Sequence, residues 1–341
     1  MSAIQQLIAG LGGKKTLKSP TQISLPLWNA NTYALNSFAI AKSGSEYIIA
    51  GGVAASGNVG PSTTTNILRS TDLSSWNLVT TPSGIWKNAF YNTSTSTFII
   101  TGSNGSTQSS SNGVSWDVSP NGLPSITATE NGNINVTSDG TYEYIVIGAS
   151  VYKRQGNSAI ATASPGLGYG PPSGMGAIAV GGGRLVLTPT GSGSTFDVWV
   201  CTNLSTLSSW SKVTINGSVG HGGSVYLTYG GGYFWLSVPN GGASGLYKST
   251  DGNSWEVVSY SNLPYLLIYK NGTLFGVNNV NGPSAVIYSE DGINWNSVSI
   301  NPGTLRVGCI FKDTDGPLLI VFAFNYGSDT FTNVLYRLEY S

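Results

Sequence analysis

The sequence predicts an all-β protein, a seven-bladed β-propeller with four-stranded blades, and three observations predict it. A turn that ends in tryptophan recurs five times, a hairpin of two apolar strands recurs seven times, and the chain is rich in glycine but only 9% charged. Repeats of about 40 to 50 residues with four short strands each are typical of propeller blades. Seven such repeats account for nearly all of the 341 residues.

The tryptophan turns share a hydroxyl-rich strand end, a tight polar turn and the tryptophan itself. They occupy residues 70–76, 110–116, 202–210, 249–255 and 289–295. In such turns Asp or Asn bonds the backbone two residues on, Gly tolerates positive φ, and Trp folds back over the turn. The interval from Trp116 to Trp210 is twice the others, which predicts a degenerate sixth copy at residues 151–159 with Ala159 in place of Trp.

The apolar hairpins predict two strands of every blade. They span residues 37–52, 88–102, 133–148, 176–188, 223–239, 264–277 and 307–324. The seventh repeat ends after three strands, so its fourth strand is predicted from Thr21–Leu25, which has period-two alternation. This pairing joins the two ends of the chain and closes the ring, which removes the exposed sheet edges that invite aggregation.

Residues 1–20 are predicted to form a separate segment ahead of the propeller at residues 21–341. Ile4, Leu7, Ile8 and Leu11 recur at helical spacing before a Gly-Gly break. Two interpretations stay open: a short helix packed on the propeller, or a docking segment that a larger assembly grips. The segment lacks the basic region and small-residue cleavage site of a secretory signal.

Composition excludes several classes of partner. The formal net charge is zero, which argues against a nucleic-acid groove and against an anionic membrane surface. We find no stretch long enough to span a bilayer, so we expect no membrane insertion. His221 is the single histidine, and Cys201 and Cys309 fall in different blades, so we expect no metal site and no cofactor.

The turns at residues 249–255 and 289–295 resemble the Asp-box, or BNR-type, repeats of sialidase-like β-propellers, although each is one residue shorter than the usual box. The resemblance covers about residues 20–341 and implies a propeller in which the box is a structural turn at the rim. The first eight residues, followed by glycine-rich sequence, resemble the openings of some bacteriophage tail and fibre proteins.

We expect no catalytic residues, so the chain is predicted not to be an enzyme. A sialidase needs an arginine cluster for the substrate carboxylate, but Arg69, Arg154 and Arg337 fall at or near third-strand positions, away from the axis. Glu130 and Asp139 remain as a carboxylate pair. They lie at opposite ends of one predicted strand, farther apart than a glycosidase pair.

Binding is therefore the expected activity, and the loops indicate a face for it. The longest insertions, at residues 53–65, 164–174 and 189–195, join strands on the same side of a propeller. The candidate ligand-binding aromatics near that face are Trp28, Trp86, Tyr169 and Tyr265. For Trp28 and Trp86 the alternative is a structural wedge between adjacent blades.

Together these features favour a non-enzymatic structural or receptor-binding protein of a phage virion. It would attach to other virion proteins through residues 1–20 and present the propeller to a host-surface glycan, a host protein or neighbouring subunits. The alternative is a cellular scaffold propeller that binds a protein partner, similar to the Asp-box assembly factors of photosystem II. A glycan hydrolase is the third hypothesis.

Overall fold

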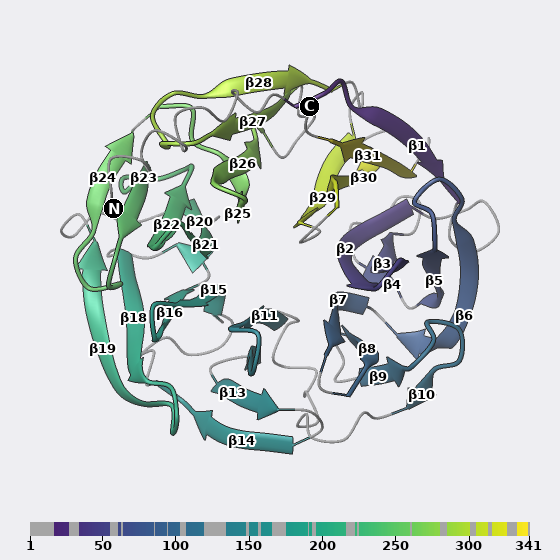
Figure 1. Cartoon of the computed structure of the whole chain (residues 1–341), viewed down its shortest axis with the longest axis horizontal. Helices are drawn as coiled ribbons and strands as arrows, with labels where there is room; N and C mark the ends of the chain where they lie inside the picture. Colours follow the sequence, from purple (N-terminus) through teal and green to yellow (C-terminus); the bar gives the residue numbers. More distant parts are fainter. Residues whose placement is uncertain are drawn as a thin grey trace, which may run out of the picture.

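The computed structural model shows a ring of seven antiparallel sheets, which confirms the seven-bladed β-propeller (Figure 1). It describes residues 17–26, 34–54, 61–62, 64–84, 86–93, 95–102, 107–118, 134–147, 150–155, 158–165, 175–189, 191–192, 196–215, 222–223, 225–259, 261–279, 285–300, 305–312, 316–325 and 333–339. Within these ranges the regular secondary structure is all β-strand, without a helix. A membrane-spanning helix is accordingly absent from the described residues.

Each of blades 1 to 4 has four strands in sequence order from the axis outward. Blade 1 consists of β2 (Ala34–Ser43), β3 (Glu46–Ala54), β5 (Thr64–Ser70) and β6 (Asn77–Gly84), with β4 (Pro61–Ser62) paired to β3. Blade 2 consists of β7 (Trp86–Asn92), β8 (Thr97–Gly102), β9 (Thr107–Ser110) and β10 (Asp117–Val118). Blade 3 consists of β11 (Ile134–Ser138), β12 (Glu143–Ile147), β13 (Ser150–Gln155) and β14 (Ser158–Ala163). Blade 4 consists of β15 (Met175–Gly181), β16 (Arg184–Pro189), β18 (Phe196–Asn203) and β19 (Ser208–Ile215).

Blades 5 and 6 repeat this order, and blade 7 takes its outer strand from the amino-terminal part of the chain. Blade 5 consists of β21 (Tyr226–Gly230), β22 (Tyr233–Val238), β23 (Gly245–Ser249) and β24 (Glu256–Ser259). Blade 6 consists of β25 (Tyr265–Lys270), β26 (Thr273–Val277), β27 (Ala285–Ser289) and β28 (Asn296–Ser299). Blade 7 consists of β29 (Leu305–Lys312), β30 (Leu318–Asn325), β31 (Asn333–Leu338) and β1 (Thr21–Leu25). A small extra sheet pairs β17 (Gly191–Ser192) with β20 (Gly222–Gly223).

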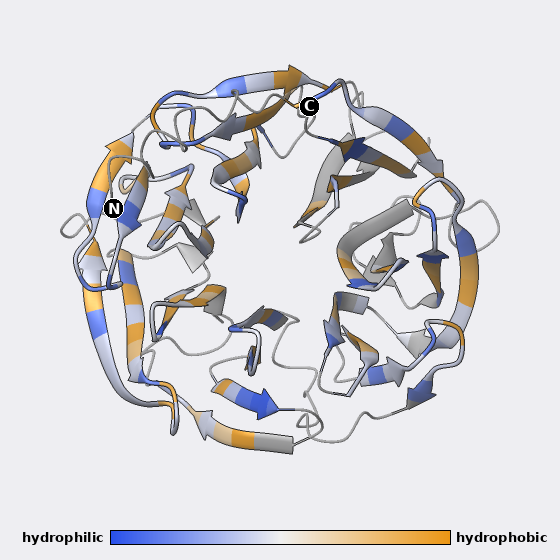
Figure 2. Cartoon of the chain, in the orientation of Figure 1, coloured by the Kyte–Doolittle hydropathy of each residue, from blue (hydrophilic) through white to orange (hydrophobic). Residues whose placement is uncertain are grey.

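The seven predicted hairpins are confirmed as the two strands nearest the axis in each blade. The innermost strands β2, β7, β11, β15, β21, β25 and β29 contact one another in a closed cycle. The second strands are the most apolar and the most buried, whereas the outer strands alternate hydrophobic and hydrophilic residues (Figure 2). The hydrophobic core therefore lies between the blades, as a ring of clusters rather than one centre.

Strand β1 closes the ring as the sequence predicts. It lies antiparallel to β31, with Thr21 opposite Arg337 and Leu25 opposite Asn333, and Figure 1 shows it (purple) outside β31 (yellow). The hydroxyl of Tyr336 donates a hydrogen bond of 2.9 Å to Oε1 of Gln22. This side-chain bond joins residues from the two ends of the chain.

The residues just before β1 also belong to the packed ring. Leu17 is only 8% exposed and lies in a hydrophobic cluster with Phe275 and Val286 of blade 6. The backbone N–H of Lys18 donates a hydrogen bond of 2.8 Å to the carbonyl of Glu339. The predicted boundary at residue 20 stays a prediction, but Leu17 and Lys18 already belong to the packed propeller. Residues 1–16, including Ile4, Leu7, Ile8 and Leu11, lie outside the described residues.

The five tryptophan turns share one geometry. In four of them the Asp or Asn side chain accepts two backbone N–H groups; Asp251, for example, binds the amides of Asn253 and Ser254 at 2.9 and 2.8 Å. In all five, the residue three before the tryptophan has positive φ and its carbonyl accepts a hydrogen bond from the indole N–H. These pairs are Trp76–Leu73, Trp116–Gly113, Trp210–Leu207, Trp255–Gly252 and Trp295–Gly292, at 2.6 to 3.3 Å.

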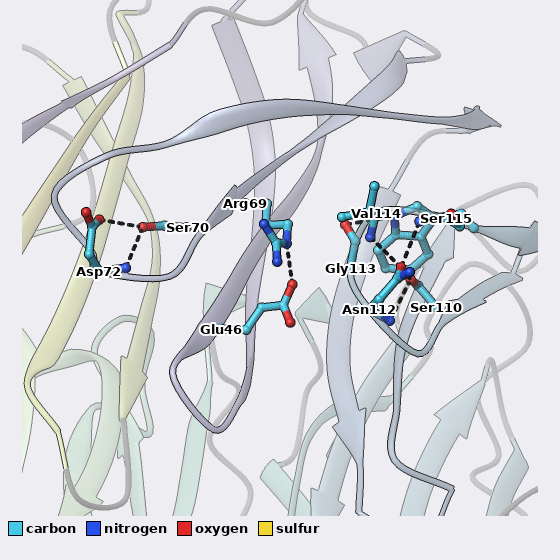
Figure 3. Close-up of polar contacts among 10 residues, drawn as sticks. Glu46, Arg69, Ser70, Asp72, Ser110, Asn112, Gly113, Val114 and Ser115 are labelled. Carbon is cyan, nitrogen blue, oxygen red and sulfur yellow. Dashed lines mark hydrogen bonds and ion pairs between the residues drawn. The ribbon is translucent and has the colours of Figure 1, made fainter.

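These turns also connect each blade to the one before it. A Cβ added to Gly252 of blade 5 would lie 2.8 Å from Cγ2 of Val186 in blade 4. A Cβ added to Gly113 of blade 2 would meet the ion pair of Arg69 and Glu46 in blade 1, beside which the Asn112 turn lies in Figure 3. In the blade 1 and blade 4 turns the tip leucine and its tryptophan belong to hydrophobic clusters with the preceding blade. In the blade 6 turn Trp295 belongs to such a cluster, and a Cβ added to Gly292 would lie 3.0 Å from Leu246 of blade 5. The turn is thus an interblade contact as well as a local cap.

The degenerate sixth copy is confirmed as the connection from β13 to β14 in blade 3. Arg154 is the last residue of β13 that pairs with β12, a position where blades 1, 2, 5 and 6 have the turn serine. Its side chain is fully buried, and Glu143 lies opposite it in the β12–β13 register. The Nδ2 group of Asn92, in blade 2, donates a hydrogen bond of 3.2 Å to Glu143. Blade 3 therefore contacts its neighbour through charged and amide side chains.

Candidate functional site

Of the four predicted ligand-binding aromatics, two fall outside the described residues and one is structural. Trp28 and Tyr169 lie in ranges that the structure does not describe. Trp86 is fully buried in a cluster with Ile48 and Ile67 of blade 1, and a Cβ on Gly84 would overlap its ring. For Trp86 the structure supports the wedge between blades rather than ligand contact, because no part of the side chain reaches solvent.

Tyr265 is the predicted aromatic that lines a hollow. It begins β25 and borders a groove of about 460 Å³ between blades 5 and 6. The groove is lined by Pro239, Asn262, Leu263, Tyr265, Asn278, Ile287, Trp295, Asn296 and Ser297. We refer to this as the blade 5–6 groove. Part of its lining comes from the β22–β23 and β26–β27 connections, which join a second strand to a third, and from the β24–β25 connection, which joins an outer strand to the next innermost strand. Connections of these two kinds open on the face that was predicted to bind.

The groove combines aromatic surface with neutral amide groups. Tyr265 is half-buried, and its hydroxyl donates a hydrogen bond of 3.3 Å to Oδ1 of Asn240. Asn262, Asn278 and Asn296 are exposed on the lining, and none of the nine lining residues is charged. A primary amide offers both donors and an acceptor, so this set complements another amide, such as a peptide bond, better than it complements an ion.

Trp295 has two roles in this region. Its indole N–H caps the turn of blade 6 at the carbonyl of Gly292, 3.0 Å away, while its half-buried ring also borders the blade 5–6 groove. In the sequence, Trp295 is recognisable only as a turn residue, and nothing distinguishes the three asparagines. The one available signal was the density of Asn around the β25 connection, which a single sequence does not separate from ordinary loop composition.

Asp139, of the predicted carboxylate pair, and Asp197, which the sequence does not single out, both have structural partners. Burial acts to raise the pKa of Asp139, but hydrogen bonds from the Tyr142 and Thr141 amides and the Tyr144 hydroxyl outweigh it and lower the pKa. Asp197 is buried and accepts hydrogen bonds from Thr214 and Lys212. Glu130 lies outside the described residues.

Glu143 differs from these carboxylates because burial dominates. Burial raises the pKa of Glu143 to about 7, and the attraction of Arg154 only partly opposes that rise. The same burial lowers the pKa of Arg154 from its usual value. The described residues contain no cluster of three or more His, Cys, Asp or Glu that is suited to a metal ion.

The comparisons with known proteins identify the fold. No family model matches the sequence, and no curated protein matches it with significance. Solved structures do match over nearly the whole chain. One is described as YCF48 bound to a D1 peptide, with a TM-score of 0.62, 14% identity and 94% of each chain covered.

Virginiamycin B lyase from Staphylococcus aureus is a second structural neighbour. A catalytically inactive variant with quinupristin has a TM-score of 0.63 and 8% identity, and the selenomethionine form has 0.62 and 12%. In both cases 95% of this chain and 99% of the other are covered. At these identities the likeness concerns the fold alone.

The neighbours correct the prediction that the chain is not an enzyme. That prediction treated the absence of a sialidase-like residue set as an exclusion of catalysis. The exclusion of enzymatic activity is wrong, because virginiamycin B lyase, which is an enzyme, has a similar fold. An arginine cluster and a carboxylate pair are requirements of sialidases and other glycosidases, and enzymes with other chemistry use other residues.

Proposed function

We propose that this chain is a peptide-binding propeller and that the blade 5–6 groove holds an uncharged, extended segment of a protein partner. The lining carries the proposal, because three exposed asparagines and two aromatic rings border one 460 Å³ hollow without a charged residue. Asn side chains match the donors and acceptors of a peptide backbone, and Tyr265 and Trp295 supply flat apolar surface. The structural neighbour that is bound to a peptide supports the same class of function.

The uncharged lining also predicts what the groove rejects. A Lys or Glu side chain that enters it loses hydration without gaining an opposite charge, which costs more than it returns. We therefore expect bound segments to be rich in polar, uncharged and aromatic residues. Segments with several charges should bind weakly, and binding should depend little on salt.

The test is selection of linear dodecapeptides from a random ribosome-displayed library on the immobilised full chain, followed by fluorescence polarisation with the enriched peptides. Tyr265→Ala should weaken binding about tenfold or more, as truncation of an aromatic anchor usually does. Tyr152→Ala in blade 3 is the matched control, because this half-buried tyrosine lies away from the groove. No enrichment, or equal affinity for Tyr265→Ala and wild type, would contradict the proposal.

The finer predictions from the sequence stand as further proposals. They are the Asp-box family, attachment to other virion proteins through residues 1–20, location in a phage virion and contact with a host-surface glycan. Docking through Ile4, Leu7, Ile8 and Leu11 rests on residues outside the described ranges. Removing residues 1–16 keeps Leu17 and Lys18 in place and therefore tests docking without disturbing the closure of the ring.

A further inference from the structure

A second hollow lies on the propeller axis and is separate from the blade 5–6 groove. It has a volume of about 420 Å³, within the range of sites for small molecules. Innermost strands of five blades and the residue just before β21 supply its lining: Asn135, Val136, Ala177, Ile178, Val225, Tyr226, Leu227, Leu266, Leu267, Ile268, Cys309 and Ile310. We refer to this as the central channel.

The side chains that line the central channel are mostly apolar and within reach of solvent, while polar atoms share the exposed lining with them. Apart from Asn135, the Tyr226 hydroxyl and the Cys309 thiol, its side chains are hydrocarbon, and none of the twelve residues is charged. Val136, Leu266 and Ile268 are partly exposed, as are four other apolar or weakly polar residues of the lining. An apolar molecule that displaces water from such a surface gains about 25 cal/mol for each Å² of apolar area removed from water.

Strand β25 departs from regular geometry to make this lining. In a regular strand alternate residues share a face, but Leu266, Leu267 and Ile268 all border the channel. The pairing with β26 shifts register between Tyr265 and Ile268, and Leu266 has a φ of 56°. A left-handed leucine is strained by about 1–2 kcal/mol, and such strain is retained mainly where a site requires it.

Register shifts also occur in the innermost strands β2, β7, β15 and β29, of which β15 and β29 line the channel. In these two strands shifts fall between Met175 and Ala177 and between Val307 and Cys309. A bulge turns a side chain toward a surface that the regular pleat would not give it. The ring of Tyr226, on the channel, packs edge-to-face against Tyr265 with centroids 6.2 Å apart, so an aromatic pair separates the channel from the blade 5–6 groove.

We infer that the central channel binds a small, uncharged molecule, of the size of two or three rings, with both apolar surface and a few neutral hydrogen-bonding groups. Asn135 and Tyr226 are the polar side chains of the lining that face such groups. The inference goes beyond peptide binding and does not depend on it, because the two hollows share no lining residue.

The first test uses N-phenyl-1-naphthylamine, a neutral apolar fluorophore, with the full chain. We expect saturable binding of one probe per chain. Cys309 borders the channel and is partly exposed, so its alkylation by N-ethylmaleimide reports on access, whereas Cys201 is buried outside the channel. At about ten times the dissociation constant, the probe should slow alkylation of Cys309 about tenfold, since only about a tenth of the channels stay empty.

The second test fills the channel. Ala177→Trp places a large ring in the lining and should weaken probe binding at least about tenfold. Ile160→Ser removes an exposed apolar side chain from the outer strand of blade 3 and should leave binding unchanged. If Ala177→Trp does not fold, protection of Cys309 in the wild type decides. Non-saturable binding, or a Cys309 alkylation rate unaffected by the probe, would overturn the inference whether or not peptides bind the groove.

Discussion

Blade 3 differs from the blades with tryptophan turns in the residues that pair where its second and third strands meet the turn. In blades 2, 5 and 6 the turn serine lies opposite an apolar residue of the second strand: Ser110 opposite Phe98, Ser249 opposite Phe234 and Ser289 opposite Leu274. In blade 3 the corresponding pair is Arg154 opposite Glu143. The fold therefore requires a filled interblade contact at this position, and it accepts either a capped hydrophobic turn or a charged pair.

The two solutions differ in what stabilises them. The tryptophan turn combines short-range hydrogen bonds with apolar burial, so most of its polar groups are satisfied within the turn itself. In blade 3 the buried Arg154 lies opposite Glu143, whose carboxylate attracts the guanidinium, and both groups lose hydration on burial. A buried ion pair is costly to break from one side but is replaceable by apolar packing.

The largest effect is expected from breaking the blade 3 pair from one side. At pH 8, where Glu143 is mostly ionised, Arg154→Ala leaves its half-buried carboxylate without a counter-charge and should lower the free energy of unfolding by about 3 to 4 kcal/mol. The double change Glu143→Leu with Arg154→Ser copies the Leu274–Ser289 pair of blade 6 and should recover most of the loss. Urea unfolding of the three proteins measures this. A double variant less stable than Arg154→Ala would show that the two solutions are not interchangeable.

The next effect concerns the tryptophan turn itself. Trp76 is 7% exposed, in a cluster with Leu319 and Leu335 of blade 7, so Trp76→Ala should cost about 3 kcal/mol through lost packing. Trp76→Phe keeps much of the packing and loses the hydrogen bond to the Leu73 carbonyl, and should cost about 1 kcal/mol. Thermal unfolding compares them. Equal losses would mean that the indole N–H, rather than apolar burial, makes the contact.

A smaller effect separates backbone strain from interblade packing. Gly252 and Gly272 have φ of +74° and +89°, but a Cβ on Gly252 meets Val186 at 2.8 Å, whereas a Cβ on Gly272 meets nothing within 4 Å. Gly272→Ala should cost about 1 kcal/mol from strain alone, and Gly252→Ala about 2 kcal/mol because blade 4 must also shift. If circular dichroism melts show the same loss for both, the turn tip does not brace the preceding blade.

The smallest effect is the dependence on pH, and its sign differs between the two regions. Because burial raises the pKa of Glu143 to about 7, the folded protein holds a proton that the unfolded chain releases near pH 4.5. The free energy of unfolding should therefore fall by roughly 1 kcal/mol between pH 5 and 8, after screening by water. The slope should vanish in Glu143→Gln; a slope that persists in that variant would assign it elsewhere.

The turn carboxylates titrate in the opposite sense. Burial acts to raise the pKa of Asp291, but hydrogen bonds from Asn294 and Ile293 outweigh it and lower the pKa to about 2. Stability from this turn is present above about pH 4 and is lost as the pH falls toward 2. Asp291→Asn should remove that acid-side loss and leave the Glu143 slope intact, which serves as the control for the pH series.

Much of the fold was predictable because its signals are local and repeated. The Asp72 and Asp291 turns specify their own hydrogen bonds within a few residues, and the pairing of Thr21–Leu25 with the last blade follows from counting strands. The role of Leu17 was not predictable, since the hydrophobic cluster that contains it gathers residues far apart in the chain, such as Phe275. The blade 5–6 groove was predicted only at Tyr265, because Asn262, Asn278 and Asn296 come together from separate connections.

The sequence alone determined the number of blades, the positions of the turns and the closure by β1, because each of these depends on local turn chemistry and strand periodicity. The tertiary structure decided which polar residues are buried and which hollows form. Arg154 in a degenerate turn and Leu266 in an ordinary apolar strand carry no local mark of their surroundings. Burial and cavity shape depend on contacts between blades, and those contacts exist only once the ring has closed.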